Sequence, residues 1–126
     1  MAKVSKVTAE HVETADGFEG HYTDTDGFTI GFETYSADQD VAPLFAGLPD
    51  DACQCPHWGY VIAGQVDFRY TDGTTDEIRS GEAYYARPGH TPILHAGTEV
   101  VEFSPSDDLG KTMAVVERNM GALSAS

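Results

Sequence analysis

Short runs of alternating apolar and polar residues, separated by turn residues, make up most of the chain. The run 28–35 alternates in this way, so its apolar side chains would share one face of a strand. Asp-Gly pairs recur at positions 16–17, 26–27 and 72–73. Such pairs supply the positive φ angles that tight hairpins require. The pattern therefore predicts a mostly β protein.

Two hairpins are expected in the second half of the chain. Residues 65–70 and 75–78 flank a turn that contains Asp72-Gly73. Residues 91–95 and 98–103 flank Ala96-Gly97 and are predicted to pair as a second hairpin. The other expected strands are 21–23 and 82–86.

Helical spacing is confined to two segments. Residues 42–47 predict one short helical turn, and residues 109–123 predict an amphipathic helix that Asp107 or Asp108 would cap. This helix would cover one open end or face of the β structure. Its predicted apolar stripe is Met113, Val116, Met120 and Leu123.

Length and charge narrow the possible classes of function. The 126 residues predict a single domain, 1–126, with a β core over about 20–105. Twenty-one acidic and seven basic residues give a formal charge of −14, which argues against nucleic acid or anionic lipid as a partner. No apolar stretch approaches the roughly 18 residues of a membrane span. With no signal peptide evident at the start, we expect a cytoplasmic protein.

The segment with the most candidate functional residues is Cys53-Gln54-Cys55-Pro56-His57. If this segment is a strand, Cys53, Cys55 and His57 point to one face, about 7 Å apart. Thiolate and imidazole are good ligands for zinc, iron or copper. The alternative is that the two cysteines are small buried core residues, free thiols in a reducing compartment, and that the histidine is hydrogen-bonded in the core.

A second group of candidates follows the turn Arg87-Pro88-Gly89. His90 comes directly after that turn, and His95 lies five residues on with the opposite strand parity. Only one of the two histidines should therefore face a site. In the predicted second hairpin, His90 would lie inside, whereas His95 would lie outside on the face of Glu102.

Together, these two segments resemble the two-motif signature of the cupin superfamily over roughly residues 45–105. The resemblance rests on Tyr60-Val61-Ile62-Ala63-Gly64, then Gly81-Glu82, then Arg87-Pro88-Gly89. Locally, Cys-Pro-His-Trp-Gly-Tyr-Val followed by Pro-Gly-His-Thr-Pro resembles small bacterial cupins of unassigned function. The resemblance implies a jelly-roll β-barrel with a short C-terminal helix, often dimeric, with a site inside the barrel mouth.

The metal-binding residues of the resembled family, three histidines and one glutamate, are absent as a set. Where the family has its glutamate this chain has His57, and its two first-motif histidines correspond to Cys53 and Asp51. The histidine of the second motif corresponds to Pro92, two residues beyond His90. The replacement ligand set that we predict is Cys53, His57 and His90, with Cys55 or Asp51 as a fourth ligand.

Two functions from different classes follow, and the sequence leaves open whether the protein is an enzyme. The first is a metal-dependent cupin that acts on a small molecule through a divalent transition metal (zinc, iron, nickel or copper). The second is a metal-free barrel that binds a small ligand or acts as a sensor. A redox-sensitive module built on Cys53 and Cys55 is a third hypothesis. A homodimer is expected from the resemblance alone.

Overall fold

Ten strands and one long helix form the part of the chain that the structure describes. This computed structural model describes residues 3–125, with side chains described up to residue 122. The strands are β1 (His11–Ala15), β2 (Phe18–Thr25), β3 (Phe28–Tyr35), β4 (Gln39–Asp40), β5 (His57–Ala63), β6 (Gln65–Tyr70), β7 (Thr75–Arg79), β8 (Ala83–Ala86), β9 (His90–Leu94) and β10 (Thr98–Pro105). The helices are the 3₁₀ turns η1 (Ala42–Phe45) and η2 (Pro49–Asp51) and the α-helix α1 (Ser106–Ala125).

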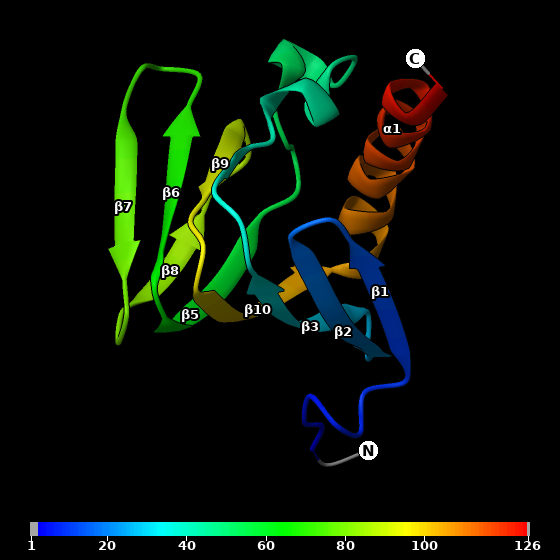
Figure 1. Cartoon of the computed structure of the whole chain (residues 1–126), viewed down its shortest axis with the longest axis vertical. Coiled ribbons are helices and arrows are strands. Elements are labelled where there is room, and N and C mark those ends of the chain that lie inside the picture. Colours follow the sequence, from blue (N-terminus) through cyan, green and yellow to red (C-terminus); the bar gives the residue numbers. More distant parts are fainter. Residues whose placement is uncertain (1–2, 126) are drawn as a thin grey trace.

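The strands form two antiparallel sheets (Figure 1). The larger sheet has the order β1-β2-β3-β10-β5-β8, and the smaller sheet has the order β4-β9-β6-β7. The strand expected at 28–35 is present with those bounds, and the hairpin expected over 65–78 is β6 paired with β7. The mostly β architecture with one C-terminal helix is thus confirmed.

The second predicted hairpin is wrong. β9 pairs with β4 and β6 in the smaller sheet, whereas β10 pairs with β3 and β5 in the larger one. The chain crosses from one sheet to the other at Ala96-Gly97, where Gly97 has a φ of +81°. Alternation of apolar and polar residues shows that a segment is a strand, but it does not show which sheet the strand joins.

The buried hydrophobic side chains form two clusters. The first cluster lies between the sheets and contains Val61, Phe68 and Val100. The second lies beneath α1 and combines Phe45 of η1 with Cys53, Cys55 and Val116. The two cysteines that the sequence analysis selected as candidate metal ligands therefore lie where α1 covers the sandwich.

Helix α1 begins three residues before its predicted start. Ser106 is its first residue, so Asp107 and Asp108 belong to the first turn rather than to the cap. Of the predicted stripe, Val116 is buried and Met120 is exposed, and the side chain of Leu123 lies outside the described part. Within residues 3–125, no helix combines the length and apolar character of a membrane span.

Candidate metal centre

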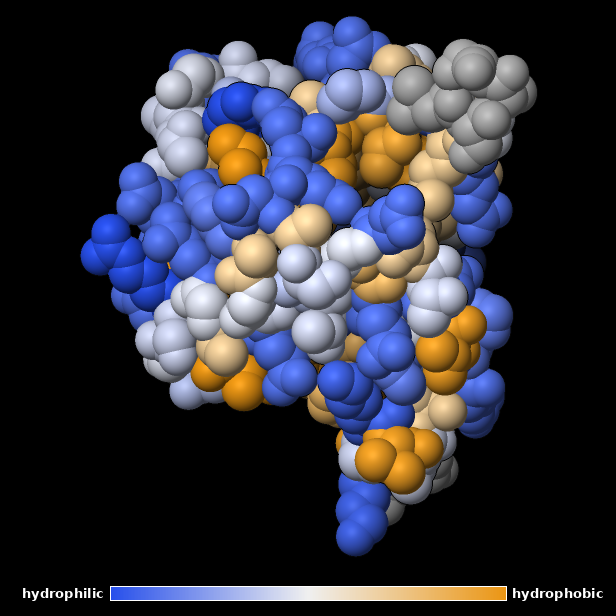
Figure 2. Space-filling view, in the orientation of Figure 1, coloured by the Kyte–Doolittle hydropathy of each residue, from blue (hydrophilic) through white to orange (hydrophobic). Residues whose placement is uncertain are grey.

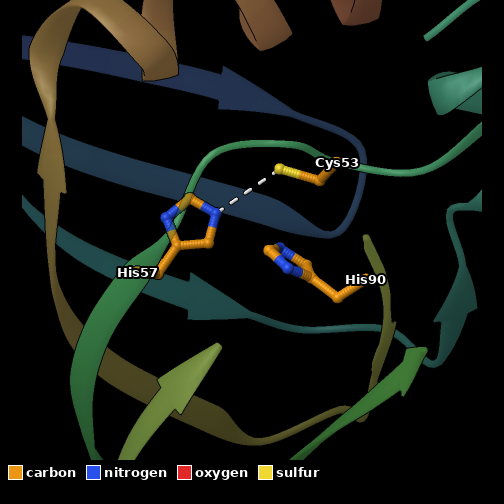
Figure 3. A group of neighbouring side chains, drawn as sticks. All are labelled: Cys53, His57 and His90. Carbon is orange, nitrogen blue, oxygen red and sulfur yellow. Dashed lines mark hydrogen bonds between the residues drawn. The ribbon is translucent and has the colours of Figure 1, made fainter. Parts of the chain in front are cut away.

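Cys53, His57 and His90 meet at one point inside the sandwich (Figure 3). Cys53 lies in the loop before β5, His57 is the first residue of β5, and His90 is the first residue of β9. All three side chains are buried, and their ligand atoms lie within 4.8 Å of one another. Cys53 Sγ lies 3.6 Å from His57 Nε2.

Backbone hydrogen bonds hold two of these residues together. The Cys53 N–H donates to the His90 carbonyl at 2.8 Å, and the Gly89 N–H donates to the Cys53 carbonyl at 2.8 Å. Gly89 has a φ of +92°, which a residue with a Cβ rarely adopts. The Pro-Gly turn before His90 is therefore fixed directly against the cysteine loop.

Residues 53–57 do not form the strand on which the same-face argument was conditional. After η2 the chain runs as a loop through Pro56, and regular pairing with β8 begins only at His57. Cys53 makes a single isolated bridge to His90. The three candidate ligands therefore converge through a folded loop and not through the two-residue repeat of a strand.

Two contacts of His57 Nδ1 indicate its tautomer. Its Nδ1 lies 3.2 Å from Glu102 Oε1 and 2.7 Å from Ser104 Oγ. An ionised carboxylate can only accept, so we assign the proton to Nδ1 in the state with Glu102 ionised. This leaves Nε2, the nitrogen nearest Cys53, with its lone pair available.

His90 is arranged in the same way. Its Nδ1–H donates to the carbonyl of Arg87 at 2.6 Å, so Nε2 carries the lone pair. The rings of His57 and His90 lie 5.0 Å apart between centroids, at an interplanar angle of 65°. Metal-binding histidines almost always donate their other N–H to a carboxylate or carbonyl in this manner.

Burial sets the protonation of the three groups. It lowers the pKa of both His57 and His90 to about 4, so both imidazoles are neutral at neutral pH. It also raises the pKa of the Cys53 thiol to about 11. Without a metal ion the thiol keeps its proton, and a metal would have to displace that proton.

The donor set fits a transition metal. One thiolate and two imidazoles suit zinc, copper or iron, and three protein ligands leave a coordination position open. At ordinary bond lengths, a sulfur and a nitrogen on one tetrahedral zinc lie about 3.5 Å apart. The 3.6 Å between Cys53 Sγ and His57 Nε2 matches that separation.

The other predicted or considered ligands lie apart from this group. Cys55 is fully buried with Val116, and its Sγ lies 3.4 Å from the carbonyl of Pro56. The Asp51 carboxylate is exposed and accepts a hydrogen bond from the Gly47 N–H. His95 lies 2.9 Å from Asp67, so His90 alone of the two histidines joins the group.

Two buried glutamates that the sequence analysis did not select lie in the same interior. Tyr84 O–H donates to Glu102 Oε2 at 2.5 Å, and Tyr22 O–H donates to Glu33 Oε2 at 2.6 Å. Tyr35 O–H donates to the other oxygen of Glu33 at 3.0 Å. Burial raises the pKa of each glutamate to about 7, and their mutual repulsion adds to the rise for Glu33. Glu102 was expected on the outer face with His95, and that placement is wrong.

Two glycines in the strands make room for these tyrosines. Gly31 and Gly59 are the cross-strand neighbours of Glu102 on either side. Tyr84 lies across Gly59, and Tyr22 lies across Gly31. A glycine inside a strand commonly marks such a close approach, and this was the available sequence signal for the hidden carboxylates.

Gly59→Ala should therefore destabilise the fold. An added Cβ would lie 2.4 Å from Tyr84 Cζ, so the ring must move and its bond to Glu102 is lost. We expect the unfolding free energy in urea to fall by about 2–3 kcal/mol. Gly110→Ala in α1 is the control, because nothing lies within 4 Å of its Cβ position. Equal stability of Gly59→Ala and the wild type would contradict this account of Gly59.

The site opens into a large cavity. Its volume is about 1130 Å³, and its walls include both sheets and the inner face of α1. Figure 2 shows hydrophobic side chains in a recess between the η1–η2 segment and α1. A cavity of this size accommodates a drug-sized molecule.

A two-sheet antiparallel sandwich with a buried Cys-His-His group inside is the class of protein that these observations define. No family model matches the sequence, and no curated protein matches it. Solved structures resemble it at low identity. A protein of unknown function from Rhizobium leguminosarum bv. viciae 3841 is 20% identical, with 82% of this chain and 95% of that chain covered and a TM-score of 0.58.

Two further solved structures share the fold, and the printed name of the first identifies it as a cupin. An RmlC-like cupin from Shewanella frigidimarina NCIMB 400 is 13% identical, covering 83% of this chain and 91% of that chain, with a TM-score of 0.57. The polyketide cyclase RemF from Streptomyces resistomycificus is 16% identical, covering 83% and 79%, with a TM-score of 0.58. The chain has the cupin fold, as its two motifs predicted.

Proposed function

We propose that this protein binds a divalent transition metal through Cys53, His57 and His90 and uses it on a small molecule in the cavity. The observation that carries the proposal is the convergence of three buried donors, with both imidazoles already directed by hydrogen bonds on Nδ1. A bound ion with an open position would polarise an oxygen of the substrate or lower the pKa of a bound water. The reaction itself is left unassigned.

Metal binding is tested on protein purified without a histidine tag. We expect about one metal ion per chain by elemental analysis, or a clear rise in melting temperature on adding zinc, iron, nickel or copper. Affinity should fall about ten-fold for each unit that the pH is lowered from 8 to 6, since the displaced proton comes from the thiol. Protein that carries no metal and gains no stability with any of the four ions would refute the proposal.

One observation favours a second function, a metal-free ligand-binding module. The protonated Cys53 thiol can donate to His57 Nε2 across 3.6 Å, which satisfies both groups without an ion. The cavity would then bind its ligand by shape and hydrogen bonding alone. Stabilisation of the protein by organic ligands but by none of the metals would favour this function.

We also propose that two copies pair through the outer face of the larger sheet. Its exposed aromatic side chains are contiguous, with Trp58 5.1 Å from Tyr85 and 6.4 Å from Phe28 between ring centroids. From typical side-chain areas, this face offers about 500 Å² per copy, so two copies bury about 1,000 Å², near the lower limit for a specific interface. Its members are Phe28, Trp58, Tyr60, Ile62, Tyr85 and Phe103, each 41–50% exposed.

Light scattering behind a sizing column tests this pairing. We expect twice the mass of one chain for the wild type, and the mass of one chain for Trp58→Ser combined with Tyr85→Ser. Val7→Ser removes an apolar side chain that is 93% exposed elsewhere and should leave the dimer intact. A monomeric wild type at micromolar concentration would overturn the proposal.

A further inference from the structure

No lysine or arginine side chain lines the cavity within the described part of the chain. Its lining histidines are His11, which lies 3.1 Å from Glu13, and the two candidate metal ligands His57 and His90. The carboxylates that line the cavity are Glu13, Asp16, Asp24, Glu33, Glu102 and Glu117.

Most of the cavity wall beside η1 and α1 is apolar. The polar end, with Cys53, His57 and the two deep glutamates, lies between the sheets. The cavity thus combines apolar walls with a few inward-facing polar groups, which is the usual construction of a small-molecule site. The apolar residues are Val41, Leu44, Phe45, Leu109, Met113 and Val116.

We infer that the cavity of the metal-free protein selects a largely apolar small molecule that is uncharged or positively charged, and that it rejects carboxylates, sulfates and phosphates. An anionic group that left water for this interior would find no lysine or arginine among the described lining residues and would lie near Glu33 and Glu102. Burial of an unpaired charge is costly, and a like charge nearby raises that cost. The inference rests on the proposed function only in assigning the polar end to the reacting group, and it concerns the protein without its metal ion, whose positive charge would attract an anion.

Matched aromatic probes test the charge selection directly. The three probes share one naphthalene body: 2-naphthol is neutral, 2-naphthylmethylamine is cationic and 2-naphthoate is anionic at pH 7.5. Binding is measured by isothermal titration calorimetry on the full chain after dialysis against EDTA. We expect the naphthol and the amine to bind at least about ten-fold more tightly than the naphthoate.

Two variants locate the binding in this cavity. Met113→Trp fills the apolar part and should weaken naphthol binding by at least about ten-fold, whereas the volume-conserving Met113→Leu should retain it. Glu33→Gln removes one carboxylate from the cavity interior. The difference in affinity between naphthol and naphthoate should therefore become smaller. Glu99→Gln is its control, because it removes the same charge from a side chain that instead pairs with Lys6.

The outcomes separate this inference from the proposed metal site. Naphthoate that binds as tightly as naphthol would overturn the charge selection, and failure of all three probes to bind would overturn the ligand class. Both results would leave metal binding by Cys53, His57 and His90 standing. A protein that binds no metal but shows the expected order of probes would support the inference and refute only the metal proposal.

Discussion

His57→Ala is expected to lower the affinity for the metal ion by at least about a hundred-fold and to abolish metal-induced thermal stabilisation. Losing this imidazole removes a ligand atom 3.6 Å from Cys53 Sγ. It also leaves Glu102 without its contact to Nδ1. Isothermal titration with zinc on the tag-free protein measures the affinity, and a thermal scan with and without zinc measures the stabilisation.

The matched control for His57→Ala is His95→Ala. His95 pairs with Asp67 in the smaller sheet, apart from the three ligands, so zinc affinity should stay within about two-fold of the wild type. Cys55→Ser is a second control, since Cys55 lies outside the three-residue group. Unchanged zinc affinity in folded His57→Ala, or an equal loss in His95→Ala, would show that zinc binds elsewhere.

Glu33→Gln should make the protein more stable at high pH and change little at low pH. Burial raises the pKa of Glu33 to about 7, above its ordinary value of 4.5, so folding favours the protonated carboxyl. That stability is fully present below pH 4.5 and is lost as the pH rises to 7 and beyond. Glutamine cannot ionise, so it avoids the loss and should be about 2–3 kcal/mol more stable than the wild type at pH 8.

Urea unfolding at pH 4.5 and pH 8 measures this difference. The control Glu99→Gln removes an acid on the outer face that lies 3.5 Å from Lys6, and it should change stability by less than about 1 kcal/mol at both pH values. The explanation fails if Glu33→Gln gives the same offset from the wild type at pH 4.5 as at pH 8.

Much of the fold was predictable because each element has a local cause. The alternation over 28–35 and the Asp72-Gly73 turn define a strand and a hairpin that the structure contains. The pairing of β9 and β10 was not predictable from pattern alone. Their alternation is compatible with a hairpin, and only packing between two sheets separates them.

The candidate site was predictable in its residue types but not in its geometry. Two cysteines and two histidines in short motifs indicated a metal site made of Cys53, His57 and His90, but the assumed strand spacing kept Cys55 as a possible fourth ligand. A folded loop places only Cys53 beside His57. Glu33 and Glu102 were missed because glutamates are abundant in this chain, and only the register opposite Gly31 and Gly59 distinguishes Glu102.

The main-chain hydrogen bonds between the Cys53 and His90 segments also determine which part of the site could be grafted onto another protein. Two donors 37 positions apart in sequence share a pair of main-chain bonds, so neither segment carries the geometry alone. Grafting the cysteine motif onto another sandwich would reproduce the ligands but not their spacing. The smallest portable unit is the two loops together, including the left-handed glycine that precedes the second histidine.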